Sequence, residues 1–160
     1  MKPILEEHPC YEDIPGMTKD VVAYVDGQPR LYKRPRMPLL CAEIAASHAP
    51  SVRIGIEMLL DTGTDITIIK PEKVRELGER LGGVIPPLSV QFEHELAPAY
   101  DLKLVFPGNH SYSGCIGFIA PEDHEFDLGD VWLGQDVLNQ LVVTFDGVNG
   151  TVTIVDPKDP

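Results

Sequence analysis

The sequence predicts an all-β fold, a small closed β-barrel with one or two short helices. Three observations favour this fold: many short apolar and β-branched runs, 14 glycines and 15 prolines that separate them, and few windows with helical periodicity. With 160 residues and 43% hydrophobic side chains, the chain can build one domain with its own core. We expect this domain at residues 37–157, with residues 1–36 as an N-terminal extension and residues 158–160 as a tail.

The extension differs from the rest of the chain in composition. It is interrupted by five prolines, and residues 30–36 contain a cluster of four basic side chains. The apolar run at residues 21–25 and the run at residues 30–33 flank Asp26-Gly27. An Asp-Gly pair between two such runs indicates a small hairpin.

From residue 38 onwards the pattern is that of successive strands. Strands are expected at residues 39–46, 52–60, 66–69, 88–92, 102–106, 115–120 and 131–134. A terminal hairpin is expected from residues 142–145 and 151–155, with Asn149-Gly150 in its turn. Residues 71–81 are instead amphipathic, with Pro71 in the first turn and glycines after the end, which predicts a helix. Residues 135–141 suit a second helix of one or two turns.

The most informative segment is Asp61-Thr62-Gly63-Thr64, which directly follows the apolar residues Met58-Leu59-Leu60. A carboxylate at the end of a buried strand is costly unless its neighbours hold it. Gly63 lets the chain turn sharply and lets another backbone or a substrate approach closely. This pattern is what an active-site loop for aspartyl proteolysis requires.

Together with the downstream segment Trp132-Leu133-Gly134-Gln135-Asp136, this loop resembles the retropepsin-like aspartic proteases over roughly residues 37–157. The resemblance implies a barrel of the acid-protease type and a homodimer with a single active site, to which each copy contributes Asp61. The chemistry agrees, because aspartyl proteolysis needs two carboxylates that share one proton. The chain has no second Asp-Thr/Ser-Gly, so a second copy must supply the second acid.

The resemblance also implies roles for the neighbours of Asp61. In the active-site loop formed by Thr62, Gly63 and Thr64, the Thr62 hydroxyl would reach the partner loop and the Gly63 carbonyl would meet the substrate backbone. Asp65 would lie near the substrate. The loop would be supported by Leu133, Gly134, Gln135 and Asp136. The chain departs from the family at position 135, where arginine is usual, and in the expected flap at about residues 82–100, which contains prolines and has glycine only at its start.

Composition argues against several other classes of protein. A net charge of −12 disfavours nucleic acid and anionic membranes as partners, and no apolar run reaches transmembrane length. Three distant cysteines without a CxxC pair favour a reduced, cytoplasmic chain rather than a disulfide scaffold. The five histidines lack metal-ligand spacing, and we expect neither a metal nor any other cofactor.

Two alternatives to proteolysis remain. Asp-Thr-Gly-Thr superficially resembles the acid of phosphoaspartate enzymes, but those need a parallel α/β sheet, for which this chain has too few helical windows. A retropepsin-like domain can also lose activity and persist as a dimerisation or peptide-binding module. We therefore expect an aspartic endopeptidase that cleaves peptide or protein substrates, with the catalytically silent module as the alternative.

Overall fold

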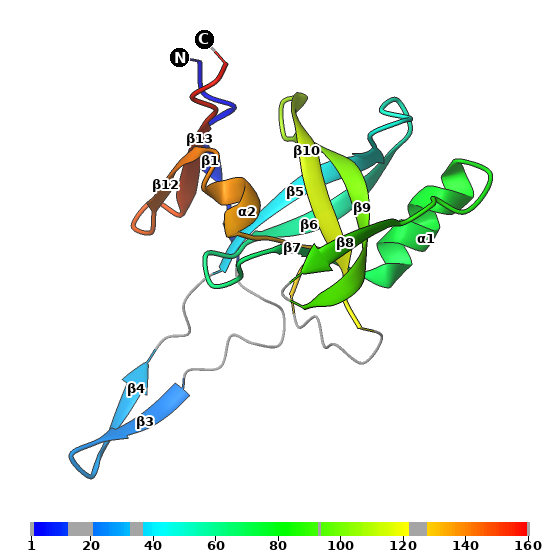
Figure 1. The fold of residues 1–160 in the computed structure, drawn as a ribbon. Helices are drawn as coiled ribbons and strands as arrows, with labels where there is room; N and C mark the ends of the chain where they lie inside the picture. Colours follow the sequence, from blue (N-terminus) through cyan, green and yellow to red (C-terminus); the bar gives the residue numbers. More distant parts are fainter. Residues whose placement is uncertain (1, 13–20, 33–36, 93, 122–127, 160) are drawn as a thin grey trace.

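The structure is a computed structural model of the chain and describes residues 2–12, 21–32, 37–92, 94–121 and 128–159. Figure 1 shows a β-barrel with helix α1 on one side, a small sheet near the two termini on another, and a hairpin that stands apart. The expected all-β architecture with two short helices is confirmed. No helix in the described ranges is long and apolar enough to cross a membrane.

The barrel consists of six strands whose pairing returns to its starting point. In order of pairing these strands are β5 (Met37–Ala46), β6 (Arg53–Leu60), β11 (Val131–Leu133), β7 (Thr67–Ile69), β10 (His110–Ile119) and β9 (Glu95–Phe106), and β9 pairs again with β5. Strand β8 (Leu88–Phe92) adds to the free side of β9, and β2 (Tyr11–Glu12) pairs with the start of β5. Because the ring closes, the inward-facing side chains share one core, to which Ile44, Ile69, Leu104 and Leu133 contribute with no exposed surface.

One crossing in the barrel positions the candidate site. Strands β6 and β7 follow each other in the sequence but do not pair, because β11 lies between them, parallel to β6 and antiparallel to β7. Leu133 at the end of β11 is level with Leu60 at the end of β6. The chain segments that leave these two parallel strands therefore emerge side by side, although they are more than 70 residues apart in the sequence.

Both predicted helices are present. Helix α1 (Pro71–Arg80) begins with proline at its first turn, carries Glu72 there, and buries Val74 and Leu77 against the barrel, as its periodicity indicates. Helix α2 (Gln135–Leu138) is shorter than the predicted range of 135–141. It stops at Asn139, because the following residues form a tight turn that leads into the next strand, with Leu141 N–H donating to the Leu138 carbonyl.

Two strands are longer than their apolar runs predict. Residues 102–106 are only the second half of β9, and residues 115–119 are only the second half of β10, which ends at Ile119. The outer, first half of β9 pairs with β8, and the first half of β10 pairs with residues 103–106 of β9. Most side chains of Glu95–Phe106 before residue 102 are exposed or half-buried. The outer parts therefore lack a hydrophobic pattern, and only strand pairing reveals them.

The termini form a second, three-stranded antiparallel sheet. In it, β13 (Thr151–Val155) lies between β1 (Leu5–Pro9) and β12 (Val142–Asp146), so the expected terminal hairpin is confirmed and gains an N-terminal strand. Ile4, Leu5 and Cys10 are buried in the main core, so the beginning of the extension contributes to it. The domain boundary at residue 36 remains a prediction.

The hairpin expected around Asp26-Gly27 is also present. Strands β3 (Val21–Val25) and β4 (Gln28–Tyr32) pair across this two-residue turn, in which Asp26 and Gly27 have φ angles of 52° and 74°. Positive φ at both central positions is the geometry that an Asp-Gly hairpin turn requires.

Candidate active site

Asp61 is the first residue after β6, at the point where the chain leaves the barrel. The three preceding residues are buried, Met58 completely, whereas Asp61 is partly exposed. The Asp61 backbone N–H donates to the Leu133 carbonyl at 3.0 Å, which continues the pairing of β6 with β11 by one residue. The backbone of this acid is therefore fixed by the sheet while its side chain remains accessible to water.

The carboxylate of Asp61 is oriented by its own loop. Its Oδ1 atom accepts a hydrogen bond from the Gly63 N–H at 2.9 Å. A Cβ atom at position 63 would lie 3.2 Å from that oxygen, so glycine keeps this approach free of steric conflict. Among the residues that the structure describes, no other group donates to the carboxylate, which leaves Oδ2 available for solvent or substrate.

The loop of residues 61–66 is bound along its length to the start of α2. The Gln135 N–H donates to the Thr64 carbonyl at 2.9 Å, and the Asp136 N–H donates to the Asp65 carbonyl at 3.1 Å. The Gln135 side chain also donates through Nε2 to the Thr62 carbonyl at 2.6 Å. Glutamine at this position therefore stabilises the loop through the Thr62 backbone rather than through the acid at position 65.

Thr67, at the start of β7, is a residue that sequence reasoning missed. Its side chain is completely buried, and its hydroxyl donates to Asp136 Oδ1 at 2.8 Å and accepts from the Gly134 N–H at 3.1 Å. The Thr67 backbone N–H donates to Asp136 Oδ2 at 3.1 Å. These bonds hold the first turn of α2 against β7. The only signal in the sequence was a hydroxyl within an otherwise apolar, β-branched run.

Cys115 lies beside Thr67 in the core. It has no exposed surface, and burial raises the pKa of its thiol to about 12; the charge of Asp136 acts in the same direction, and a hydrogen bond with Thr67 opposes it. The thiol therefore stays protonated at neutral pH. Cys115 therefore packs as a small buried residue of the core.

Gly134 allows the two segments to touch. A Cβ atom at this position would collide with the Ile66 carbonyl oxygen and lie 2.5 Å from its carbon and 3.0 Å from the Ile66 nitrogen. These are backbone atoms, which cannot rotate away. Any larger residue would force the start of α2 and the loop of Asp61 apart.

The structure thus brings together all the residues predicted for the site. Residues 61–65 contact residues 133–136 through backbone and side-chain hydrogen bonds, and Thr62, Gly63 and Asp65 are exposed. The catalytic and binding roles of these residues remain predictions. Trp132 is half-buried, and its Nε1 atom donates to the Leu128 carbonyl at 2.7 Å. In the described part of the chain, no group of His, Cys, Asp and Glu side chains could hold a metal ion.

The predicted flap region forms a hairpin of β8 and the outer part of β9, with Leu88 opposite Ala99 and Gln91 opposite Leu96. Leu88 and Leu96 have exposed fractions of 44% and 74%. A hairpin that exposes two leucines can contact a peptide. Proline at position 98 restricts the backbone of its second strand.

No protein-family model matches the chain, and no curated protein matches it in sequence. Among solved structures, it is similar to one described as a retropepsin-like aspartic protease from Rickettsia conorii, with 13% sequence identity and a TM-score of 0.46. The match covers 85% of this chain and 89% of that chain. A similarity this distant carries no argument about activity, which depends on the residues around Asp61.

Proposed function

We propose that this protein is an aspartic endopeptidase that acts as a homodimer. The observation that carries the proposal is the state of Asp61: a partly exposed carboxylate at the end of a buried strand, with one oxygen and its backbone held by hydrogen bonds. An acid that must meet a scissile bond at a defined position needs this support.

The second acid would come from a second copy of the chain. When two Asp61 side chains approach within a few ångströms, they cannot both ionise comfortably, so the pair shares one proton and titrates as a unit. The ionised carboxylate would take a proton from a water molecule while the oxygen of that water attacks the carbon of the peptide carbonyl. The protonated carboxyl would donate to the carbonyl oxygen and later assist departure of the amine.

Rigidity of the loop supports this chemistry. Hydrogen bonds from Gln135 and Asp136 to three loop carbonyls, those of Thr62, Thr64 and Asp65, fix the loop before any substrate arrives. A preorganised pair of acids avoids the cost of ordering the loop during the reaction. Exposed Thr62 is available to contact the partner loop across the dimer axis.

A peptide would bind in extended conformation between the two copies. Gly63 and Asp65 are both exposed, and the Gly63 carbonyl and the Asp65 carboxylate would accept hydrogen bonds from the peptide backbone. The β8–β9 hairpin would cover the peptide through Leu88 or Leu96. Side-chain pockets between the copies would then set the cleavage preference.

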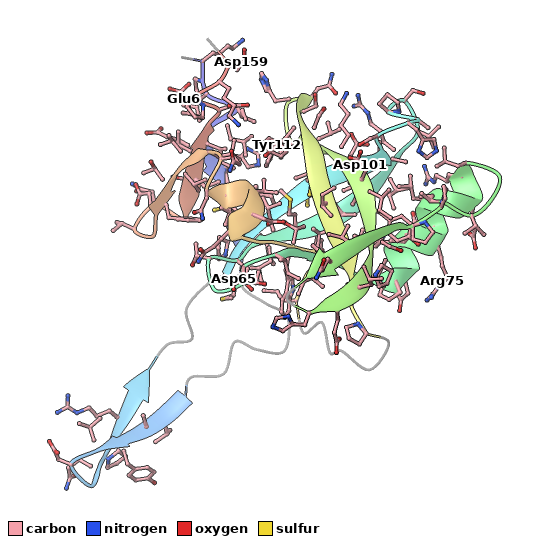
Figure 2. All side chains as sticks on the ribbon, viewed as in Figure 1. Glu6, Asp65, Arg75, Asp101, Tyr112 and Asp159 are labelled. Carbon is pink, nitrogen blue, oxygen red and sulfur yellow. The ribbon has the colours of Figure 1, made fainter. Side chains whose placement is uncertain are left out.

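Digestion of a peptide library by wild type and by Asp61→Asn in parallel tests the proposal. The variant keeps the shape of the side chain and removes the ionisable group, so it should stay folded and lose cleavage. Asp159→Asn is the matched control, because Asp159 is exposed and lies near the chain ends, away from the loop that carries Asp65 (Figure 2). Cleavage by Asp61→Asn at the wild-type rate would show that the assignment is wrong.

A mixing experiment tests the shared site separately. Excess Asp61→Asn protein added to wild type should lower activity beyond simple dilution, because each mixed dimer has only one ionisable acid. If activity only follows dilution, one copy is sufficient for catalysis. A wild-type protein that forms dimers but cleaves nothing between acidic and neutral pH would favour the catalytically silent module.

A further inference from the structure

Asp65 is an exposed acid on a backbone that is held in place. Its carbonyl accepts a hydrogen bond from the Asp136 N–H at 3.1 Å, and the Thr64 carbonyl accepts from the Gln135 N–H at 2.9 Å. The Thr64 hydroxyl donates to the Ile66 carbonyl at 3.0 Å, so the bonds enclose position 65 on both sides. Among the residues that the structure describes, no group donates to the Asp65 carboxylate or pairs with it. The loop therefore presents a negative charge that is fixed in position and uncompensated.

The described residues that donate hydrogen bonds to this loop bring no positive charge to it. Gln135 is neutral, and its Nε2 atom is engaged by the Thr62 carbonyl at 2.6 Å. Asp136 follows it and is acidic. The β8–β9 hairpin, which would cover a bound peptide, has no lysine or arginine in residues 88–99, and Glu95 is exposed there. A positive charge near Asp65 would thus have to come from the substrate.

The described cations of the barrel and of α1 are engaged elsewhere. Arg53 begins β6, at the end of that strand opposite to the candidate loop. Lys73 Nζ donates to the Gly55 carbonyl at 3.4 Å, and Arg80 donates to the Arg53 carbonyl at 3.3 Å, so both lie at that end. Lys103 is level with Arg53 across β5. Figure 2 shows Arg75 and Asp65 on opposite sides of the barrel. The other described cations are Lys70, which pairs with Asp130, and Lys2, Arg30 and Lys158, in the terminal segments and the β3–β4 hairpin.

Long-range electrostatics act in the same direction as Asp65. The protein carries a net charge of −12. A field of this sign attracts cationic peptides and repels acidic ones before any contact forms. A fixed carboxylate in the cleft then gives the attraction a defined position, because charge-assisted hydrogen bonds are short and directional.

We propose that the substrates are peptides with a lysine or arginine close to the scissile bond, and that the Asp65 carboxylate selects this side chain. Asp65 follows Asp61 by four residues, which span at most about 14 Å. An extended peptide rises about 3.3 Å per residue, so the basic side chain would lie within about four positions of the scissile bond. A carboxylate has acceptor sites for the peptide backbone and the cation together. This inference rests on the proposed function and adds the class of substrate.

Peptides that differ in one charge test the inference. Digestion of a library by wild type first locates the position at which lysine and arginine are enriched. Two peptides are then compared, with arginine or with citrulline at that position, because citrulline keeps the length and planarity of arginine without its charge. Wild type should cleave the arginine peptide with a kcat/KM about tenfold higher. Asp65→Asn should lose most of this ratio, whatever its effect on the overall rate.

Two further variants separate a local effect from a general one. Asp159→Asn removes the same charge from an exposed position near the chain ends, away from Asp65 (Figure 2), and should keep the wild-type ratio. Gln135→Arg adds a cation beside the loop and should lower the ratio while Asp65 is still present.

The outcomes distinguish this inference from the proposed function. Equal cleavage of both peptides by wild type, or a ratio that survives in Asp65→Asn, would overturn the inference and leave the endopeptidase intact. An equal loss of the ratio in Asp159→Asn would also overturn it, because net charge rather than Asp65 would then set the preference. A wild-type protein that cleaves no peptide would overturn the proposed function and this inference with it.

Discussion

Replacement of Gly134 by alanine probes the contact on which the site depends. The added Cβ atom would lie 2.5 Å from the Ile66 carbonyl carbon, whereas ordinary van der Waals contact begins near 3.4 Å. The start of α2 and the loop of Asp61 would therefore have to separate by roughly 0.9 Å, the difference between those two distances. Neither side can yield by a side-chain rotation, because both are backbone.

The size of the effect follows from this displacement. Overpacking of a well-packed site costs about 1–3 kcal/mol. For a chain of this length each kcal/mol lowers the melting temperature by about 2–4 °C. Catalysis should suffer more, because a misplacement of about 1 Å at a reacting group can lower the rate about a hundredfold. We therefore expect Gly134→Ala to fold, melt several degrees lower, and lose most of its activity.

The assay compares thermal unfolding and peptide cleavage in Gly134→Ala and Gly55→Ala. Gly55 is a strand glycine of β6 with nothing within 4 Å of the position that a Cβ atom would occupy. Gly55→Ala should therefore match wild type in both measurements. If Gly134→Ala were as stable and active as Gly55→Ala, the reasoning that links this contact to the geometry of Asp61 would be refuted.

Three further predictions concern the surroundings of the site and the termini. Thr67→Val should lower the free energy of unfolding by about 1–3 kcal/mol in urea titrations, because the buried Gly134 N–H loses its acceptor. Thr67→Ser keeps the hydroxyl and should retain most of the stability. An equal loss in both variants would contradict a hydrogen-bonding role for Thr67. Iodoacetamide at neutral pH should alkylate exposed Cys41 in the native protein and spare buried Cys115, whose pKa is raised to about 12. If mass spectrometry finds both thiols modified at equal rates, Cys115 is not buried. Hydrogen bonds from Asn149 and Val148, led by the Asn149 backbone N–H, hold the pKa of Asp146 below its ordinary value of 3.8. A carboxylate with a depressed pKa stabilises the folded protein at pH values above its ordinary pKa, and this stability is lost as the pH falls through the lower, folded pKa. The difference in urea midpoint between wild type and Asp146→Ala should therefore shrink from neutral pH to about pH 3. A constant or growing difference would show that the carboxylate charge is not involved.

The sequence by itself determined the features whose signals are local. The amphipathic period of residues 71–81 predicts helix α1, and the β-branched runs predict the inner parts of the strands. Asp26-Gly27 marks one hairpin turn through its positive φ angles. An acid at the end of an apolar run, followed by threonine and glycine, was sufficient to single out the candidate loop.

Only the tertiary structure decided which distant residues hold that loop. The hydrogen bonds of Thr67 to Gly134 and Asp136 span 67 and 69 residues, and that of Gln135 to Thr62 spans 73. The pairing of β1 with β13, which adds the first residues to the core, joins opposite ends of the chain. Such contacts depend on strand order and register, which single-residue propensities do not encode. The closed barrel, in which β11 lies between β6 and β7, brings these segments together.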